Sequence, residues 1–163
     1  MNKAKGGFAS YIESILQQSN IDYDYSKKGP DKHSFYFSGN FDEFSATFAI
    51  TINEEDGYIF YFIKYPYEVL KDSINAVVEY ITRINFGDVF GAFIFDYVDS
   101  TVAYHLATPL GNNMDENEQW FAEYLRHAQD VVEEFHEGLL EVLGGRDPYA
   151  VLKEMGAAVT KMV

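Results

Sequence analysis

The chain of 163 residues contains no cysteine, which excludes disulfide bonds, thiolate nucleophiles and cysteine-ligated metal sites. It also lacks an apolar run that reaches the roughly 20 residues needed to span a bilayer. Its first residues, Met1 to Gly7, are not followed by the apolar segment of a secretory signal. We therefore expect a cytoplasmic protein that does not bind a membrane.

Basic residues are scarce. Lysine and arginine number 12 against 26 aspartates and glutamates, and the formal net charge is −14. A negative charge of this size repels phosphate backbones, so we expect no nucleic-acid partner. Between Asp115 and Glu141, nine acids stand against a single base, Arg126. This segment predicts either a solvated helix surface or a surface that binds a basic segment of another protein.

Hydrophobic residues make up 47% of the chain and aromatic residues 17%, so a folded core is expected. The length fits one domain. We expect a flexible N-terminus at 1–7, a single domain at 8–145 and a C-terminal helix at 146–163. The glycine pair at 144–145 separates that helix from the domain.

Three strands are predicted in the first half of the chain. Residues 44–53 alternate between apolar and polar side chains, which is typical of a strand with one solvated face. Residues 33–39 and 58–63 are predicted as further strands, and residues 22–30 as a polar loop. Both faces of 58–63 are apolar, so this strand is covered on both sides or its outer face is an interface. Pro66 is expected to end the strand and to begin a helix.

The spacing of apolar residues predicts four helices. The first begins at Phe8, the second carries an apolar stripe over 70–84, and the third extends from Asp115 to the glycine pair. Asp115 and Glu118 have the spacing of a capping box. A fourth, short helix begins at Pro148, and we expect it either to dock on its own domain or to occupy a groove that a partner would otherwise fill.

The stretch from Ile84 to Leu110 organises the chain. A helix ends at Asn85, a phenylalanine-rich strand containing Gly91 leads to a turn, and a second strand follows. Gly91 is expected where the backbone passes close to another element. The element order α-βββ-α-ββ-α-α predicts an α+β domain, with an antiparallel sheet of about five strands and helices packed mainly on one face.

This order and its central stretch resemble the YbjN family over about 8–145. The resemblance is carried by the helix that ends in Asn85, the Gly91-containing strand that ends in Asp96, and the second strand of the hairpin. It implies a fold similar to that of type III secretion chaperones. It also implies a bacterial, non-enzymatic, homodimeric domain that binds proteins or has a regulatory role, and it supplies no catalytic residues. At 86–88, Phe-Gly-Asp stands where typical members place a basic residue.

No residue pattern of a catalytic, cofactor or metal site stands out. The four histidines, His33, His105, His127 and His136, form no HExxH motif, and neither a nucleotide-binding glycine pattern nor GxSxG occurs. We therefore predict no enzymatic activity, no cofactor and no metal.

An aromatic cluster is the best candidate for a functional surface. Tyrosine offers a large contact area with a polar tip and is common at protein interfaces. An aromatic-rich core explains the same cluster equally well. A sheet that binds RNA would place several basic residues beside its aromatics, and Lys64 stands alone. The residues of this candidate interface are Tyr58, Phe60, Tyr61, Phe62, Tyr65 and Tyr67.

Our leading hypothesis is a protein-binding domain that acts as a chaperone-like or regulatory adaptor, with a protein or peptide of basic character among its partners. We expect a homodimer whose contact is formed by the second helix or by the outer face of the sheet. The competing hypothesis is an enzyme or small-ligand-binding protein that uses a cleft between sheet and helices.

Overall fold

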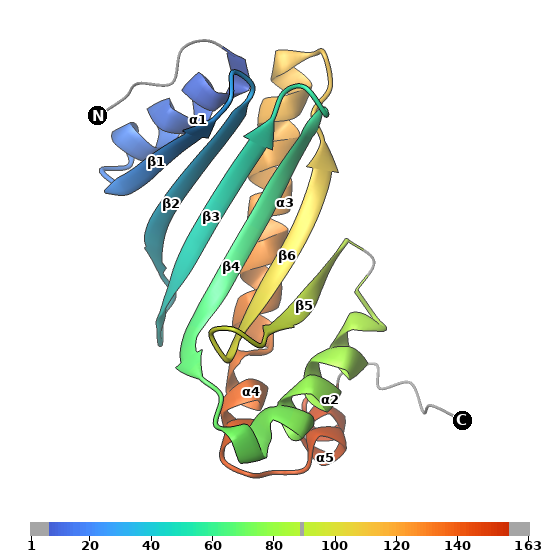
Figure 1. Cartoon of the computed structure of the whole chain (residues 1–163). Helices are drawn as coiled ribbons and strands as arrows, with labels where there is room; N and C mark the ends of the chain where they lie inside the picture. The colour runs from blue at the N-terminus through green and yellow to red at the C-terminus, as the bar shows by residue number, and fades with distance from the viewer. Residues whose placement is uncertain (1–6, 89, 157–163) are drawn as a thin grey trace.

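The computed structural model describes residues 7–88 and 90–156. They form an antiparallel six-stranded sheet in the order β1-β2-β3-β4-β6-β5, with helices over one face (Figure 1). The predicted α+β class is confirmed, and the sheet has one strand more than expected. Of the N-terminus expected to be flexible, Gly7 begins α1 and the rest lies outside the described residues. The elements are α1 (Gly7–Gln18), β1 (Tyr23–Lys28), β2 (Lys32–Asn40), β3 (Ser45–Asn53), β4 (Tyr58–Glu68), a 3-10 turn (Lys71–Ser73), α2 (Ile74–Asn85), β5 (Gly91–Asp96), β6 (Thr101–Pro109), α3 (Met114–Glu134), α4 (His136–Leu143) and α5 (Pro148–Glu154).

Strand β3 shows how the sheet divides into a covered and an uncovered face. Ala46, Phe48, Ile50 and Ile52 are buried on the side of the helices. The residues between them face the opposite side, because successive side chains of a strand alternate. The predicted alternation of this segment is therefore confirmed, and it marks the core between the sheet and the helices.

Strand β1 lies within the stretch that we predicted as a loop. It pairs with β2, with Tyr23 opposite Phe37 and Tyr25 opposite Phe35. The prediction was wrong because β1 is an edge strand with only these two aromatic side chains, and its other residues are polar or charged. Over six residues such a pattern does not distinguish a strand from a loop.

Strand β4 continues through Pro66, so the prediction that this proline ends the strand is wrong. The register of β4 against β6 shifts between Lys64 and Glu68, and Lys64 is the last β4 residue paired with β3. Proline has no N–H to donate and is tolerated at such irregularities. Helix α2 begins only at Ile74, and Leu70, which was expected on its apolar stripe, precedes the helix and is 73% exposed.

The predicted third helix is divided into two. Helix α3 ends at Glu134 and α4 begins at His136, with Phe135 at φ −95° and ψ 3° between them. The hydroxyl of Tyr80 on α2 donates a 3.0 Å hydrogen bond to the carbonyl oxygen of Phe135. A Cβ atom at Gly138 would collide with the Tyr80 hydroxyl, so glycine is what allows α4 to lie this close to α2.

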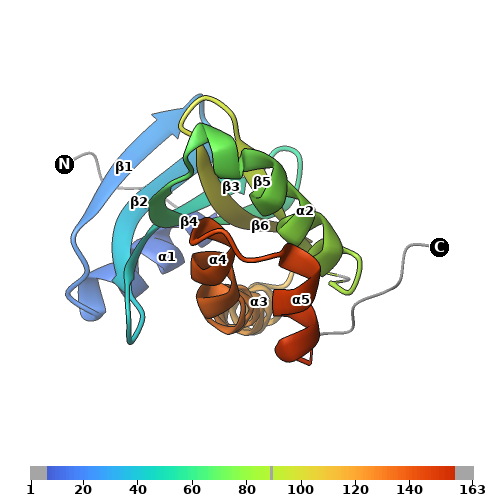
Figure 2. The same ribbon diagram turned by 90° about the horizontal axis from the view of Figure 1, so that it is seen from below.

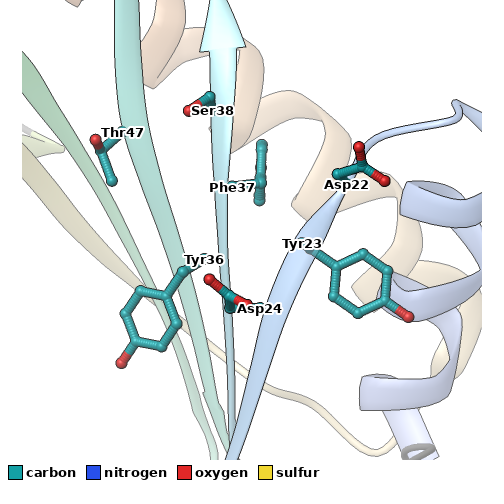
Figure 3. A pocket seen from close by; sticks show the side chains of 7 residues that line it. All are labelled: Asp22, Tyr23, Asp24, Tyr36, Phe37, Ser38 and Thr47. Carbon is teal, nitrogen blue, oxygen red and sulfur yellow. The ribbon is translucent and has the colours of Figure 1, made fainter. Parts of the chain in front are cut away.

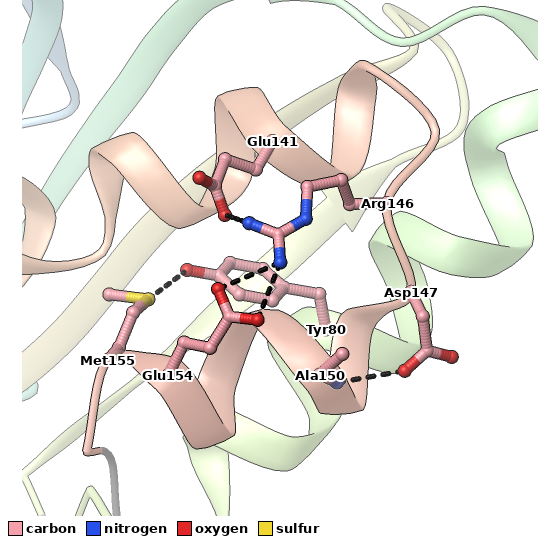
Figure 4. A network of polar contacts seen from close by, with 7 residues as sticks. All are labelled: Tyr80, Glu141, Arg146, Asp147, Ala150, Glu154 and Met155. Atoms are coloured by element: carbon pink, nitrogen blue, oxygen red, sulfur yellow. Dashed lines mark hydrogen bonds and ion pairs between the residues drawn. The ribbon is translucent and has the colours of Figure 1, made fainter.

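Two helix starts are capped by side chains. Asn113 caps α3, because its Oδ1 accepts a hydrogen bond from the N–H of Asp115 at 3.1 Å. The predicted capping box at Asp115 is therefore wrong, since Asp115 lies inside the helix. Asp147 caps α5, and its Oδ1 accepts from the N–H of Ala150 at 2.8 Å (Figure 4).

Helix α5 docks on its own domain. Val151 and Leu152 are 0% and 1% exposed and belong to the main core, where α5 contacts α2 and α4 (Figure 2). Of the two arrangements expected for this helix, the described residues therefore adopt docking. The apolar residues predicted to continue the helix at 157–163 lie outside the described residues.

Arg146 links α4 to α5 through its side chain. Its guanidinium donates to Glu141 at the end of α4 and to Glu154 on α5, each at 2.7 Å (Figure 4). These two carboxylates raise the pKa of Arg146. Gly145 has a φ of 94°, which glycine adopts without strain. The predicted end of the preceding helix at the glycine pair is thus confirmed.

The helices leave the other face of the sheet uncovered. Figure 2 shows α1, α3, α4 and α5 on one side, with α2 beside β5. Among the described helices, none has the length and apolar character that crossing a bilayer requires.

Candidate protein-binding face

The structure divides the candidate aromatics between the two faces of β4. Tyr58, Phe60 and Phe62 point away from the helices, whereas Tyr61 and Tyr65 are 1% and 2% exposed in the core. The hypothesis of one shared interface is therefore wrong for Tyr61 and Tyr65, because strand alternation separates them from the even-numbered residues.

The hydroxyls of Tyr65 and Tyr67 have hydrogen-bond partners, whereas the ring of Tyr61 stacks on Phe121 at 5.7 Å and its buried hydroxyl has no hydrogen-bond partner among the described residues. The Tyr65 hydroxyl donates a 2.6 Å hydrogen bond to the carbonyl oxygen of Val132, and burial raises the pKa of both Tyr61 and Tyr65. The hydroxyl of Tyr67, near the end of β4, lies 2.7 Å from Nε2 of His136. These three side chains connect β4 to the helices.

The register of the strands assembles what we call the open face, namely the strand side chains that point away from the helices. Tyr36 on β2 stands opposite Ala49 on β3, and Ala49 stands opposite Phe62 on β4. Phe62 in turn stands opposite His105 on β6. The central part of the open face consists of Ser34, Tyr36, Thr47, Ala49, Thr51, Tyr58, Phe60, Phe62, Ile94, Ala103, His105 and Ala107.

Aromatic rings stand among small side chains at this centre. The rings of Phe60 and Phe62 are 6.5 Å apart, and the ring of His105 meets Phe60 edge-on at 5.5 Å. Tyr36 is 42% exposed. An apolar surface of this kind, with no helix over it, is typical of a contact surface for another macromolecule.

The open face carries no net charge although the chain carries −14. Among its strand residues, three lysines stand against three acids. Lys64 lies within the central strand β4, and the other five lie toward the ends of strands or on the edge strand β1. Lys64 is paired with Asp99 at 3.1 Å. Desolvation lowers the pKa of His105, so this residue is uncharged at neutral pH. The charged residues of the open face are Lys28, Lys32, Lys64, Asp24, Glu68 and Asp96.

A hollow of ≈ 330 Å³ lies on the open face and is lined by Lys28, Lys32, Ser34, Tyr36, Thr51, Tyr58 and Phe60. Two others are lined mainly by acids and aromatics. One, of ≈ 320 Å³, lies beside the start of β1 and includes Asp22, Asp24 and Tyr36. Figure 3 shows that Tyr23 points toward α1 while Tyr36 points away from it. Its polar groups do not form the set of nucleophile, base and oxyanion donor that acyl transfer requires.

A second hollow, of ≈ 270 Å³, lies between the β2–β3 turn and the junction of α3 with α4. Its buried histidine, His136, stacks on Phe44 at 4.0 Å and has Glu43 at 3.6 Å from Nδ1. The space between the sheet and helices α2 and α4 is lined by apolar and aromatic residues and is closed to water. The space between the sheet and these two helices therefore offers no cleft of the kind that the competing hypothesis requires.

Two of the histidines lie against tyrosine hydroxyls. Nδ1 of His33 lies 2.7 Å from the Tyr25 hydroxyl, and His136 lies against Tyr67. Within 7–88 and 90–156, no three histidine, aspartate or glutamate side chains are arranged to hold a metal ion.

No pattern in the sequence indicated the polar group that surrounds Tyr104. The Tyr104 hydroxyl donates a 2.5 Å hydrogen bond to Oδ2 of Asp88, and His127 lies 3.4 Å from the same hydroxyl. Oδ1 of Asp88 accepts from the N–H of Phe90 at 2.9 Å. Asp88 thus fixes the entry to β5, at the place where the sequence departs from the basic residue of typical members.

A family model with the description "Putative bacterial sensory transduction regulator" matches residues 9–137. The chain belongs to the YbjN family. The match confirms the resemblance inferred from sequence, and it covers α1, the whole sheet and α3. The open face of this YbjN domain lies entirely inside the matched region.

Among solved structures, the chain is similar to "Crystal structure of YbjN, a putative transcription regulator from E. coli". The identity is 14% and the TM-score 0.52, over 88% of this chain and 93% of that chain. The likeness shows a shared YbjN fold. No curated protein matches the sequence.

Proposed function

We propose that this YbjN-family protein is a non-enzymatic regulator that acts by binding another protein on the open face. The observation that carries the proposal is an aromatic sheet surface whose strand residues carry no net charge, on a chain of charge −14. The centres of protein interfaces are depleted of charge and enriched in aromatic residues.

The distribution of acidic residues favours the hypothesis that the open face binds a partner over the hypothesis that it is only a solvated surface. If the open face were only a solvated surface, some of the 26 acids of the chain would be expected at its centre. None of the central residues of the open face is an acid. About half of the exposed acids lie on the helices, including Glu116, Glu123, Glu133 and Glu137. The helical side therefore keeps the protein in solution, and the open face is left for contact.

The polar groups around Tyr104 and His136 support binding over catalysis. The Tyr104 hydroxyl lies within hydrogen-bond distance of both Asp88 and His127, and Asp88 also accepts a hydrogen bond from the backbone before β5. His136 lies within hydrogen-bond distance of the Tyr67 hydroxyl. Groups committed to structural hydrogen bonds are poor candidates for proton transfer. A regulatory role also agrees with the description of the family. A chaperone-like role, in which the open face shields an apolar segment of a partner, belongs to the same proposal.

A site-specific cross-link tests the proposal. A photo-crosslinking phenylalanine analogue is placed at Phe62 on the open face, and in a matched protein at Glu123 on the exposed side of α3. After irradiation in cells of the source organism, we expect covalent adducts with a protein from Phe62 and few from Glu123. Adducts at both positions in equal amount, or at neither, would contradict binding on the open face.

A further inference from the structure

We propose that the partner of the open face inserts an acidic side chain between Lys28 and Lys32, in the ≈ 330 Å³ hollow beside the β1–β2 turn. The segment that carries this acid continues over the centre of the open face with apolar side chains. The inference rests on the proposed function, because it takes the open face to be the surface that binds another protein.

Two lysines stand together at this hollow. Lys28 on β1 and Lys32 on β2 stand directly opposite each other, and the short turn at 29–31 joins them. Like charges in this position repel each other. Among residues 7–88 and 90–156, neither lysine has an ion-pair partner. A carboxylate between the two amino groups would replace this repulsion with two attractions.

The rest of the hollow also offers hydrogen-bond donors. The hydroxyls of Ser34 and Thr51 are 2.9 Å apart and share one hydrogen bond, so one O–H of the pair remains to donate. Nδ2 of Asn53 donates to the Tyr58 hydroxyl oxygen at 3.4 Å, so the O–H of Tyr58 is available as well. Among the described residues that line the hollow, none is acidic. An ionised carboxylate only accepts hydrogen bonds, so this set of donors suits a carboxylate.

The acid of the neighbouring turn is engaged elsewhere. Oδ2 of Asp56, in the β3–β4 turn, accepts a 2.7 Å hydrogen bond from Nδ2 of Asn53, and the N–H of Asp56 donates to Oδ1 of Asn53 at 3.0 Å. Asp56 therefore closes its own turn. The two other hollows include acids in their lining, such as Asp24 in one and Glu133 in the other. Of these three hollows, only the one on the open face has a basic lining.

A segment of a protein fits this hollow better than a small molecule does. Small-molecule sites enclose most of the ligand in a volume of about 300–1,000 Å³. This hollow is at the lower end of that range, and Tyr36 and Phe60 line both the hollow and the centre of the open face. An occupant held by the lysines therefore continues onto the aromatic residues of the sheet.

The rows of the sheet set the order of side chains in such a segment. Lys32, Ser34 and Tyr36 follow one another on the same face of β2, and each step of two residues advances about 6.6 Å. Phe60 lies in the row of Ser34, and Phe62 lies in the row of Tyr36. An extended segment of the partner advances by the same distance every two residues. An acid at the lysines is therefore followed, two and four positions along, by apolar side chains over Phe60 and Phe62.

The net charge of the chain does not oppose this contact at short range. At physiological ionic strength, exposed charges are screened over about 8 Å. The acids of α3 and α4 lie behind the sheet, whereas Lys28 and Lys32 lie on its open face (Figure 2). The two lysines therefore dominate the potential inside the hollow. The charge of the whole chain predicts a basic partner, whereas the hollow calls for an acidic segment.

The Phe62 cross-link, repeated in variants of the lysine pair, tests the inference. Lys28→Glu with Lys32→Glu should lower the yield of adducts about tenfold, because both reversed charges repel the partner's acid. Lys28→Arg with Lys32→Arg keeps both charges and should keep the yield. Lys27→Glu with Lys153→Glu is the matched control, since it changes the net charge equally at exposed positions away from the open face. Circular dichroism verifies that each variant is folded.

A second measurement uses the purified protein and defined peptides. Fluorescence anisotropy compares short labelled peptides in which valine alternates either with glutamate or with lysine. We expect the natural protein to bind the glutamate peptide about tenfold more tightly, and the Lys28→Glu, Lys32→Glu protein to prefer the lysine peptide. A preference of the natural protein for the lysine peptide would overturn the inference. Equal affinity for both peptides, including no detectable binding of either, would also overturn it.

The outcomes separate this inference from the proposed function. If Phe62 captures a protein in the same yield after both lysines are reversed, binding on the open face stands and the acidic segment is wrong. The same conclusion follows if mass spectrometry maps the adduct to a basic segment of the captured protein. If Phe62 captures nothing in the natural protein, the proposed function fails, and the inference fails with it.

Discussion

The side chain of Asn85 bonds both outward-facing backbone groups of Phe93. Its Nδ2 donates to the carbonyl oxygen of Phe93 at 2.8 Å, and its Oδ1 accepts from the N–H at 2.7 Å. Phe93 lies on β5, the edge strand of the sheet. The side-chain amide of Asn85 therefore pairs the backbone of Phe93 as a neighbouring strand would. It blocks this part of a sheet edge that could otherwise pair with another chain.

Replacing Asn85 tests this role. Asn85→Ala removes both hydrogen bonds and leaves two backbone groups of Phe93 unpaired, so we expect the free energy of unfolding to fall by about 1–3 kcal/mol. Urea denaturation measures the change. Thr82→Ala, at an exposed position on the same helix, is the matched control. Equal losses in the two variants would show that the amide does not stabilise the edge.

The second prediction concerns Gly91, where the structure leaves no room for a side chain. A Cβ atom there would collide with the hydroxyl of Tyr104 and with the carbonyl oxygen of His105. We expect Gly91→Ala to lower the free energy of unfolding by about 1–3 kcal/mol, because the core around Tyr104 must shift. At Gly87 the nearest atom to such a Cβ is 3.6 Å away, so Gly87→Ala is the control with little effect. Thermal unfolding of both proteins decides the comparison.

The docking of α5 gives a third prediction. Leu152→Ala removes a core side chain and should lower the free energy of unfolding by about 2–5 kcal/mol. Lys153→Ala, at the exposed neighbouring position, should change it little. If both variants unfold at the same urea concentration as the natural protein, α5 contributes no stability to the core.

His136 makes stability depend on pH. Burial lowers the pKa of this imidazole in the folded protein, with Glu43 and Glu137 acting in the opposite direction. The unfolded chain takes up a proton near the ordinary value of 6.5, where the folded protein still resists protonation. The contribution of His136 is therefore fully present above that value and is lost as pH falls through the lowered pKa.

The variant His136→Gln isolates this effect. We expect the natural protein to lose more stability than the variant when the pH is lowered from about 7.5 to about 5.5, measured by urea denaturation. The difference between the two proteins should thus be larger at the higher pH. A constant difference over this range would mean that His136 does not titrate differently in the folded and unfolded states.

The sequence by itself determined the features that local periodicity encodes. The alternation of 44–53 predicted β3, and the segment after Asn85 predicted the β5–β6 hairpin. The apolar spacing of the helices and the order of the elements were sufficient for the α+β class and for the YbjN family. Each of these signals lies within a few turns of helix or one strand, where neighbouring side chains repeat with a fixed period.

Only the tertiary structure decided which apolar surface is covered. Both faces of β4 are apolar, so its pattern could not distinguish Tyr61 in the core from Phe62 on the open face. The sequence pattern likewise did not predict the edge strand β1, which depends on pairing with β2. Nor did it predict the break at Phe135, where the carbonyl oxygen accepts a hydrogen bond from Tyr80. These features depend on packing between residues far apart in the chain. A local sequence pattern does not specify which distant element will pack against it.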